Sequence, residues 1–125
     1  MYVTQNAQRE KAALPGIEHI TLAGGADGLS RLSVWQQSIA PGAATPPHRH
    51  DCEEVVVVKS GSGELHVEGR VIPFGPNSTI TVPSNVLHQL FNTGETTLEI
   101  TAALSASPVE VFLPDGVRLD LPWKT

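Results

Sequence analysis

The sequence is short of the features that mark several classes of protein. It contains one cysteine in 125 residues, so no disulfide can form within the chain. A reducing, cytoplasmic setting is therefore expected. No apolar run is long enough to span a bilayer, so we expect no membrane segment. The start, residues 1–11, lacks the apolar core of a secretory signal.

Positive charge is also scarce. Eight Lys and Arg residues stand against 13 Asp and Glu residues, giving a formal net charge of -5 at pH 7. Proteins that bind nucleic acid or anionic membranes usually concentrate positive charge on one face. We therefore expect neither as the main partner.

Turn-forming residues are plentiful, with 11 glycines and 10 prolines spread along the chain. Between them, β-rich runs recur about every eight to twelve residues, which is typical of an all-β sandwich or barrel. We expect a single domain over 1–125, with 1–14 as an N-terminal arm in which 5–14 looks helical. The predicted strands are 17–22, 31–39, 44–50, 54–59, 63–68, 70–74, 78–82, 87–92, 96–104, 108–113 and 116–121.

Potential metal ligands are concentrated in one short segment. His48, His50 and Glu54 fall within seven residues, and His88 follows downstream. An H-x-H pair on a strand places both imidazoles on the same side. Neutral imidazoles and a carboxylate are ligands that divalent first-row metals accept. The segment therefore indicates a metal site.

The spacing of these residues resembles the two motifs of the cupin superfamily. The first motif, G-x5-HxH-x3,4-E-x6-G, is matched over 42–61 by Gly42, His48, His50, Glu54 and Gly61. The second, G-x5-PxG-x2-H-x3-N, is matched over 77–92 by Pro83, His88 and Asn92, with Asn77 and Asn85 in place of two glycines. Asparagine tolerates positive φ better than most residues, so both replacements are compatible with the turns.

The resemblance implies a small cupin: an all-β, double-stranded β-helix (jelly-roll) barrel. It also implies that His48, His50, Glu54 and His88 bind one divalent metal ion inside the barrel. Fe(II) is the favoured ion, with Mn, Ni, Zn or Cu as alternatives. Three imidazoles and one carboxylate leave two adjacent positions of an octahedral ion open for a small-molecule substrate.

Several other residues are expected to lie outside this ligand set. Glu53 competes with Glu54, but the motif spacing selects Glu54, and Glu53 is expected to be solvated. Cys52 is expected to be a small buried filler. His19 is expected at the surface or a sheet edge, and His66 on a solvated outer face. In strand 31–39, one face lines the pocket, either Trp35, Gln37 and Ile39 or Val34, Gln36 and Ser38.

Three functions remain open from the sequence. The favoured one is a mononuclear metalloenzyme of dioxygenase type acting on a small organic molecule. The second is a non-oxidative metal-dependent lyase, isomerase or decarboxylase. The third is a non-enzymatic small-molecule binding or sensor protein, because one fold supports all three classes.

The sequence also predicts a homodimer. The run Val55–Val58 has no polar face, which indicates a strand buried on both sides. A second sheet packed over this strand in a dimer would provide such burial. The final segment resembles a terminal hairpin in which Phe112, Leu113 and Trp123 are suitable interface residues.

Overall fold

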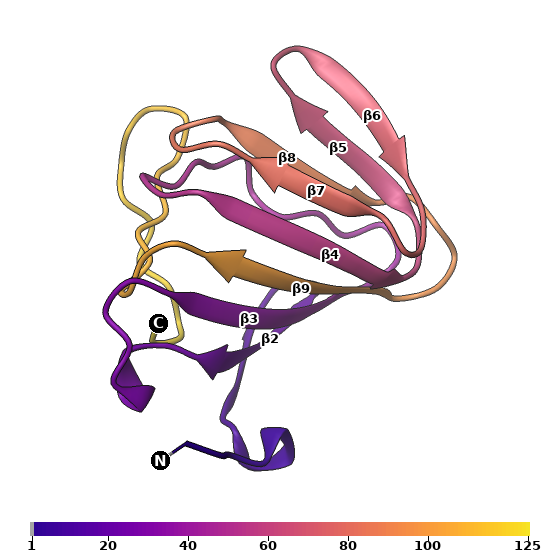
Figure 1. Cartoon of the computed structure of the whole chain (residues 1–125). Coiled ribbons are helices and arrows are strands. Elements are labelled where there is room, and N and C mark those ends of the chain that lie inside the picture. The colour runs from indigo at the N-terminus through magenta and orange to yellow at the C-terminus, as the bar shows by residue number, and fades with distance from the viewer. Residues whose placement is uncertain (1) are drawn as a thin grey trace.

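The computed structural model describes residues 2–125, whose strands form two antiparallel sheets (Figure 1). The larger sheet has the strand order β1-β2-β3-β9-β4-β7, and the smaller has the order β6-β5-β8. The strands are β1 (Lys11–Leu14), β2 (Ile17–Ala23), β3 (Ser33–Ile39), β4 (Glu54–Ser60), β5 (Gly63–Val67), β6 (Arg70–Phe74), β7 (Thr79–Val82), β8 (His88–Asn92) and β9 (Leu98–Leu104). Two short 3-10 helices, η1 (Asn6–Gln8) and η2 (Gly25–Asp27), complete the described elements.

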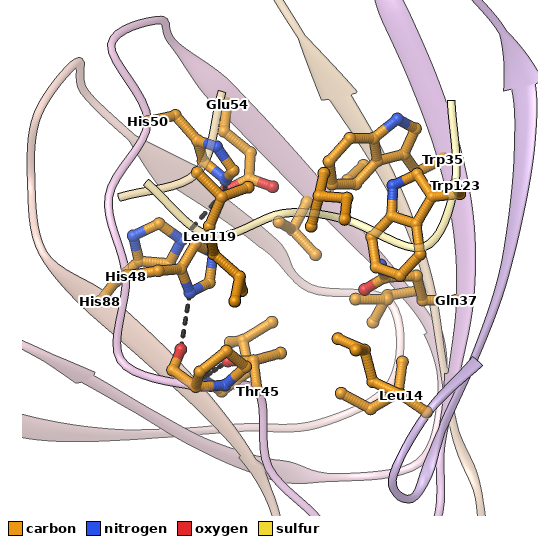
Figure 2. Close-up of a pocket in the computed structure, with 18 residues that line it drawn as sticks. Leu14, Trp35, Gln37, Thr45, His48, His50, Glu54, His88, Leu119 and Trp123 are labelled. Carbon is orange, nitrogen blue, oxygen red and sulfur yellow. Dashed lines mark hydrogen bonds and ion pairs between the residues drawn. The ribbon is translucent and has the colours of Figure 1, made fainter. Parts of the chain in front are cut away.

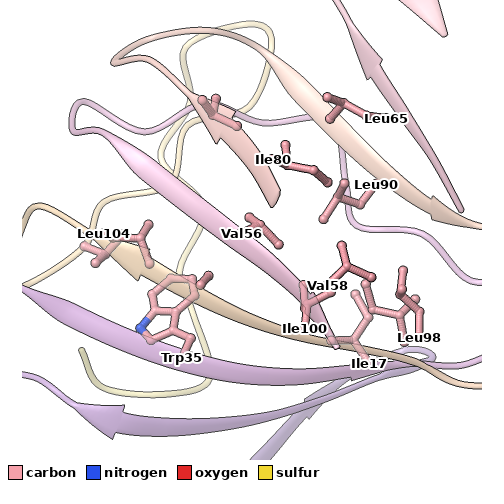
Figure 3. Close-up of a cluster of buried hydrophobic side chains, with 14 of the residues drawn as sticks. Ile17, Trp35, Val56, Val58, Leu65, Ile80, Leu90, Leu98, Ile100 and Leu104 are labelled. Atoms are coloured by element: carbon pink, nitrogen blue, oxygen red, sulfur yellow. The ribbon is translucent and has the colours of Figure 1, made fainter. Parts of the chain in front are cut away.

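The core lies between the two sheets and is built by alternation along each strand. In β9 and β3, every second residue is buried, as period-two side-chain placement requires. Figure 3 shows Leu65 and Leu90 of the smaller sheet facing Val56 and Ile100 of the larger one. Each fully buried aliphatic side chain contributes roughly 1.5–3 kcal/mol. The all-β jelly-roll prediction is confirmed.

Three predicted strands are wrong. Segments 44–50, 108–113 and 116–121 make only isolated bridges, such as His48↔His88 and Arg49↔Phe112. In the first segment, Pro46 and Pro47 have no backbone N–H with which to continue a ladder. The other predicted strands are present, with ends shifted by at most two residues.

The N-terminal arm also differs from the prediction. Residues 5–14 were expected to be helical, but only η1 has helical character, and 11–14 form β1. The pairing Leu14↔Ile17 closes a tight turn at Pro15 and Gly16, where Gly16 has a φ of 74°. This turn folds the segment onto β2, and sheet pairing overrides the helix propensity of its alanines. Among residues 2–125, no helix is long and apolar enough to cross a bilayer.

The valine run in β4 is buried on one side of the chain only. Val56 and Val58 point into the core, whereas Val55 and Val57 are 39% and 47% exposed. The expectation of burial on both faces is therefore wrong for the isolated chain. The strand alternates as a half-buried antiparallel strand does, and its outward positions carry valine.

Positive φ angles occur where the motifs require them. Asn77 and Asn85 have φ of 60° and 66°, which confirms that asparagine supplies the turn geometry at both glycine positions of the second motif. Gly42 and Gly61 of the first motif have φ of 79° and 90°. The two glycines differ in their surroundings, because a Cβ on Gly61 would lie 2.8 Å from the Leu98 Cα, and one on Gly42 would meet nothing within 4 Å.

This difference predicts unequal effects of the same substitution. Gly42→Ala should lower the free energy of unfolding by about 1–2 kcal/mol, the cost of placing an L-residue in the left-handed region. Gly61→Ala should cost more, because backbone must also move. Urea denaturation of both variants measures the difference. Equal losses would show that backbone conformation alone accounts for both glycines.

Candidate metal centre

The structure brings the four predicted ligands together inside the barrel. His48 and His50 lie on the irregular segment before β4, Glu54 is the first residue of β4, and His88 is the first residue of β8. One ligand nitrogen from each histidine lies within 4.8 Å of the others, and Glu54 lies beside this cluster. Figure 2 shows the four side chains on one side of a pocket. The bridge His48↔His88 joins the two motifs directly.

Main-chain carbonyl groups fix the orientation of all three imidazoles. A carbonyl oxygen can only accept a hydrogen bond, so each Nδ1 must carry the proton. Each Nε2 therefore presents its lone pair to the cluster, which is the tautomer that a metal ligand needs. The three bonds run from His48 Nδ1 to Pro46 O at 2.7 Å, from His50 Nδ1 to Glu110 O at 2.8 Å, and from His88 Nδ1 to Val86 O at 2.9 Å.

The centre contains buried polar atoms without hydrogen-bond partners in the described chain. Glu54 Oε1 lies 3.1 Å from His88 Nε2 and 3.7 Å from His50 Nε2. His50 Nε2 and Glu54 Oε1 are both buried and lack a hydrogen bond. Burying such atoms unpaired costs free energy. A cation between them would satisfy both, so the donor set of nitrogen and oxygen atoms fits a divalent transition metal.

The protonation of the cluster follows from burial and from Glu54. Burial lowers the pKa of His48 to about 4 and also lowers the pKa of His50. Burial acts against the charged forms of Glu54 and His88 as well, but their mutual attraction outweighs it. The pKa of Glu54 is therefore lowered and the pKa of His88 is raised. A metal ion would bind the neutral form of His88, so metal binding competes with protonation of this imidazole.

The pocket beside the cluster has mostly apolar walls and a volume of about 50 Å³. Figure 2 shows Trp35, Gln37 and Trp123 on the side opposite the histidines. Of the two candidate faces of β3, the one with Trp35 and Gln37 lines the pocket. None of the described residues that line it is Lys or Arg. The lining consists of Leu14, Ile17, Trp35, Gln37, Thr45, Pro46, His48, His50, Glu54, Val56, His88, Leu90, Ile100, Ala102, Val111, Leu119, Leu121 and Trp123.

His19 is not at the surface, contrary to the sequence expectation. It is 1% exposed and hydrogen-bonds to Thr21 and Gln37. The added strand β1 covers the edge of β2 that was expected to be free. Trp123, which was expected to be an interface residue, stacks on the His19 ring with centroids 3.8 Å apart. His19 follows the buried Ile17 by two residues, so alternation along a strand places both side chains on the same face. This pattern in the sequence could have predicted the burial of His19.

The other weighed residues lie where they were expected. Glu53 is exposed, and Cys52 is buried among core residues with the pKa of its thiol raised by burial. His66 is partly exposed and lies 3.5 Å from Glu64. Between His48 and His50, the Arg49 guanidinium donates to Asn85 Oδ1 at 2.7 Å.

Comparison with known proteins identifies the family. Residues 3–122 match the sequence profile described as auxin binding protein. The chain belongs to the auxin-binding protein family. It is 41% identical to auxin-binding protein 1 of Arabidopsis thaliana over 126 aligned positions, covering 87% of this chain and 64% of that protein. The chain thus spans less than two thirds of this relative's length.

Two further similarities extend beyond this family. An RmlC-like cupin from Shewanella frigidimarina superposes with a TM-score of 0.75 at 18% identity, covering 86% of this chain and 93% of that one. This confirms the cupin fold. A 59-residue stretch is 36% identical to 5-nitrosalicylic acid 1,2-dioxygenase from Bradyrhizobium, covering 47% of this chain and 28% of the enzyme.

Proposed function

We propose that this protein binds a small organic acid at a metal ion held in the cupin barrel. The observation that carries the proposal is the set of converging Nε2 lone pairs beside the buried, unpaired Glu54 carboxylate at the end of an apolar pocket. Relatives named for auxin binding favour the binding function over the dioxygenase favoured from sequence. We therefore propose the third of the functions left open by the sequence, a binding or sensor protein.

The proposed metal ligands are His48, His50, Glu54 and His88. A divalent ion with three neutral imidazoles and one carboxylate carries a net charge of about +1. That charge attracts an anionic ligand group, and the ion can coordinate it as a Lewis acid. The nitrogen and oxygen donors are compatible with Fe(II), Mn, Ni, Zn or Cu.

The opposite wall suits an aromatic ring. Trp35 and Trp123 meet edge to face with centroids 5.6 Å apart, and both line the pocket. An auxin-type ligand combines an aromatic ring with a carboxylate, which matches a cationic centre facing aromatic walls. The free volume of about 50 Å³ suits a few water molecules. An aromatic acid therefore requires the pocket walls to move apart.

Loss of any one proposed ligand should weaken metal binding strongly. Removing a residue that only hydrogen-bonds to a metal ligand typically lowers metal affinity roughly 10–100-fold. We expect a larger loss of affinity from each of four substitutions: His48→Ala, His50→Ala, His88→Ala and Glu54→Gln. Glu53→Gln is the matched control, because Glu53 is exposed and should leave affinity unchanged. Isothermal titration with zinc measures each variant. An equal loss in the Glu53 variant would contradict the assignment of Glu54.

Measurements with and without dioxygen distinguish a binding protein from a dioxygenase. We expect the metal-loaded protein to bind indole-3-acetate stoichiometrically and to release it unchanged, with or without dioxygen. Calorimetry measures binding, and mass spectrometry of the recovered ligand detects conversion. Oxygen-dependent consumption of indole-3-acetate or salicylate by the Fe(II)-loaded protein would instead support the dioxygenase alternative that the Bradyrhizobium similarity motivates.

We also propose that a second copy of the chain covers the outer face of the larger sheet. Val55 and Val57 of β4 pair with Ala103 and Thr101 of β9, so an uncharged patch spans neighbouring strands. Such a patch is suited to packing against an identical sheet. Light scattering should show a dimer that Val57→Lys converts to monomer. Val71→Lys, at an exposed valine of β6, is the matched control and should remain dimeric.

A further inference from the structure

His19 is a buried titratable group that the proposed ligand set does not use. Its ring packs against both tryptophans of the pocket wall: it stacks on Trp123 at 3.8 Å and meets Trp35 edge to face at 5.0 Å. Trp35 in turn lies 6.2 Å from the ring of His50. His19 therefore packs directly behind the wall that faces the metal ligands.

The hydrogen bonds of His19 specify one tautomer. The Thr21 hydroxyl has one proton, and it donates that proton to the Lys124 carbonyl at 2.8 Å. His19 Nε2, 2.8 Å from Thr21 Oγ1, must then donate to the hydroxyl. Nδ1 is left to accept from Gln37 Nε2 at 3.0 Å. This tautomer is the reverse of that in His48, His50 and His88.

Both ends of this hydrogen-bond chain reach the pocket. Gln37 lines the pocket and is the direct cross-strand partner of His19 in the β2–β3 register. Gln37 donates one of its two amide N–H groups to His19 Nδ1. Its other amide N–H and its Oε1 remain available to a molecule in the pocket. At the other end, Thr21 holds the residue that follows Trp123.

The segment that carries Trp123 has few other attachments. Leu119 N donates to Val111 O at 2.8 Å. Beyond it, residues 120–125 make two hydrogen bonds to the rest of the described chain: Thr21 Oγ1 to Lys124 O and Val109 N to Thr125 Oγ1. Leu119, Leu121 and Trp123 alternate along the segment and all line the pocket. Removing the Thr21 bond therefore removes half of these attachments.

We propose that His19 is a positioning residue for ligand binding. It sets the position of the pocket wall opposite the metal ligands through its contacts with Gln37, Thr21 and the stacked Trp123. This inference refines the proposed function, because the wall it positions is the one that would contact the ligand's ring. The position of the wall itself is a property of the ligand-free protein.

The first test needs no ligand. Long-range 1H–15N NMR of the metal-free protein near pH 7 should show the Nε2–H tautomer for His19. Order parameters for the amides of Leu121, Trp123 and Lys124 should fall in Thr21→Val from about 0.85 toward 0.6. Thr21→Ser should restore them because it restores the hydroxyl. Thr81→Val, at an exposed threonine of β7, is the matched control and should change nothing.

The second test uses zinc and indole-3-acetate as probes. Thr21→Val and His19→Phe should weaken indole-3-acetate binding to the zinc-loaded protein about fivefold while zinc affinity stays as in the wild type, consistent with loss of one hydrogen bond. A His19 that carries its proton on Nδ1, or unchanged order parameters in Thr21→Val, would overturn the proposal. Failure of the wild-type protein to bind indole-3-acetate would contradict the proposed function alone, because the first test still decides the role of His19.

Discussion

The convergence of three imidazole lone pairs on one buried point is the constraint on which the rest of the account depends. Each ring is held by a hydrogen bond from Nδ1 to a main-chain carbonyl, so none can turn its Nε2 away without leaving that carbonyl unpaired. The adjacent Glu54 carboxylate is buried with an unpaired oxygen. In the absence of a cation, His50 Nε2 and Glu54 Oε1 are buried without hydrogen-bond partners in the described chain, and this free-energy cost is what a metal ion would remove.

The fold creates this arrangement by bringing together segments that are distant in the sequence. The carbonyl partners come from the first motif, the second motif and the C-terminal region, at Pro46, Val86 and Glu110. The His48↔His88 bridge joins the two motifs, which lie where the two sheets face each other (Figure 1). The wall opposite the ligands comes from β3 and from the C-terminal segment. The positions of the metal-ligating side chains and of the opposite pocket wall are therefore set by different segments of the chain.

The sequence predicted that these side chains lie together, and for three of the four the determinants are local. His48, His50 and Glu54 occupy one short segment, and alternation along β3 marks Trp35 and Gln37 as a single face. The errors occur where distant contacts decide. The burial of His19 depends on the adjacent strand β1 and on Trp123, which is more than 100 residues away. Parity with Ile17 marks the inward face of β2, but the contact with Trp123 leaves no local pattern. Segments 108–113 and 116–121 show strand-like alternation, yet they find no extended partner strand.

X-ray absorption spectroscopy of the metal-loaded protein tests the central claim most directly. Zinc coordinated by His48, His50, His88 and Glu54 should show nitrogen or oxygen scatterers at about 2.0–2.2 Å, with outer-shell scattering from three imidazoles and no sulfur contribution near 2.3 Å. Scattering from fewer than three imidazoles, or a sulfur ligand from Cys52, would contradict the account.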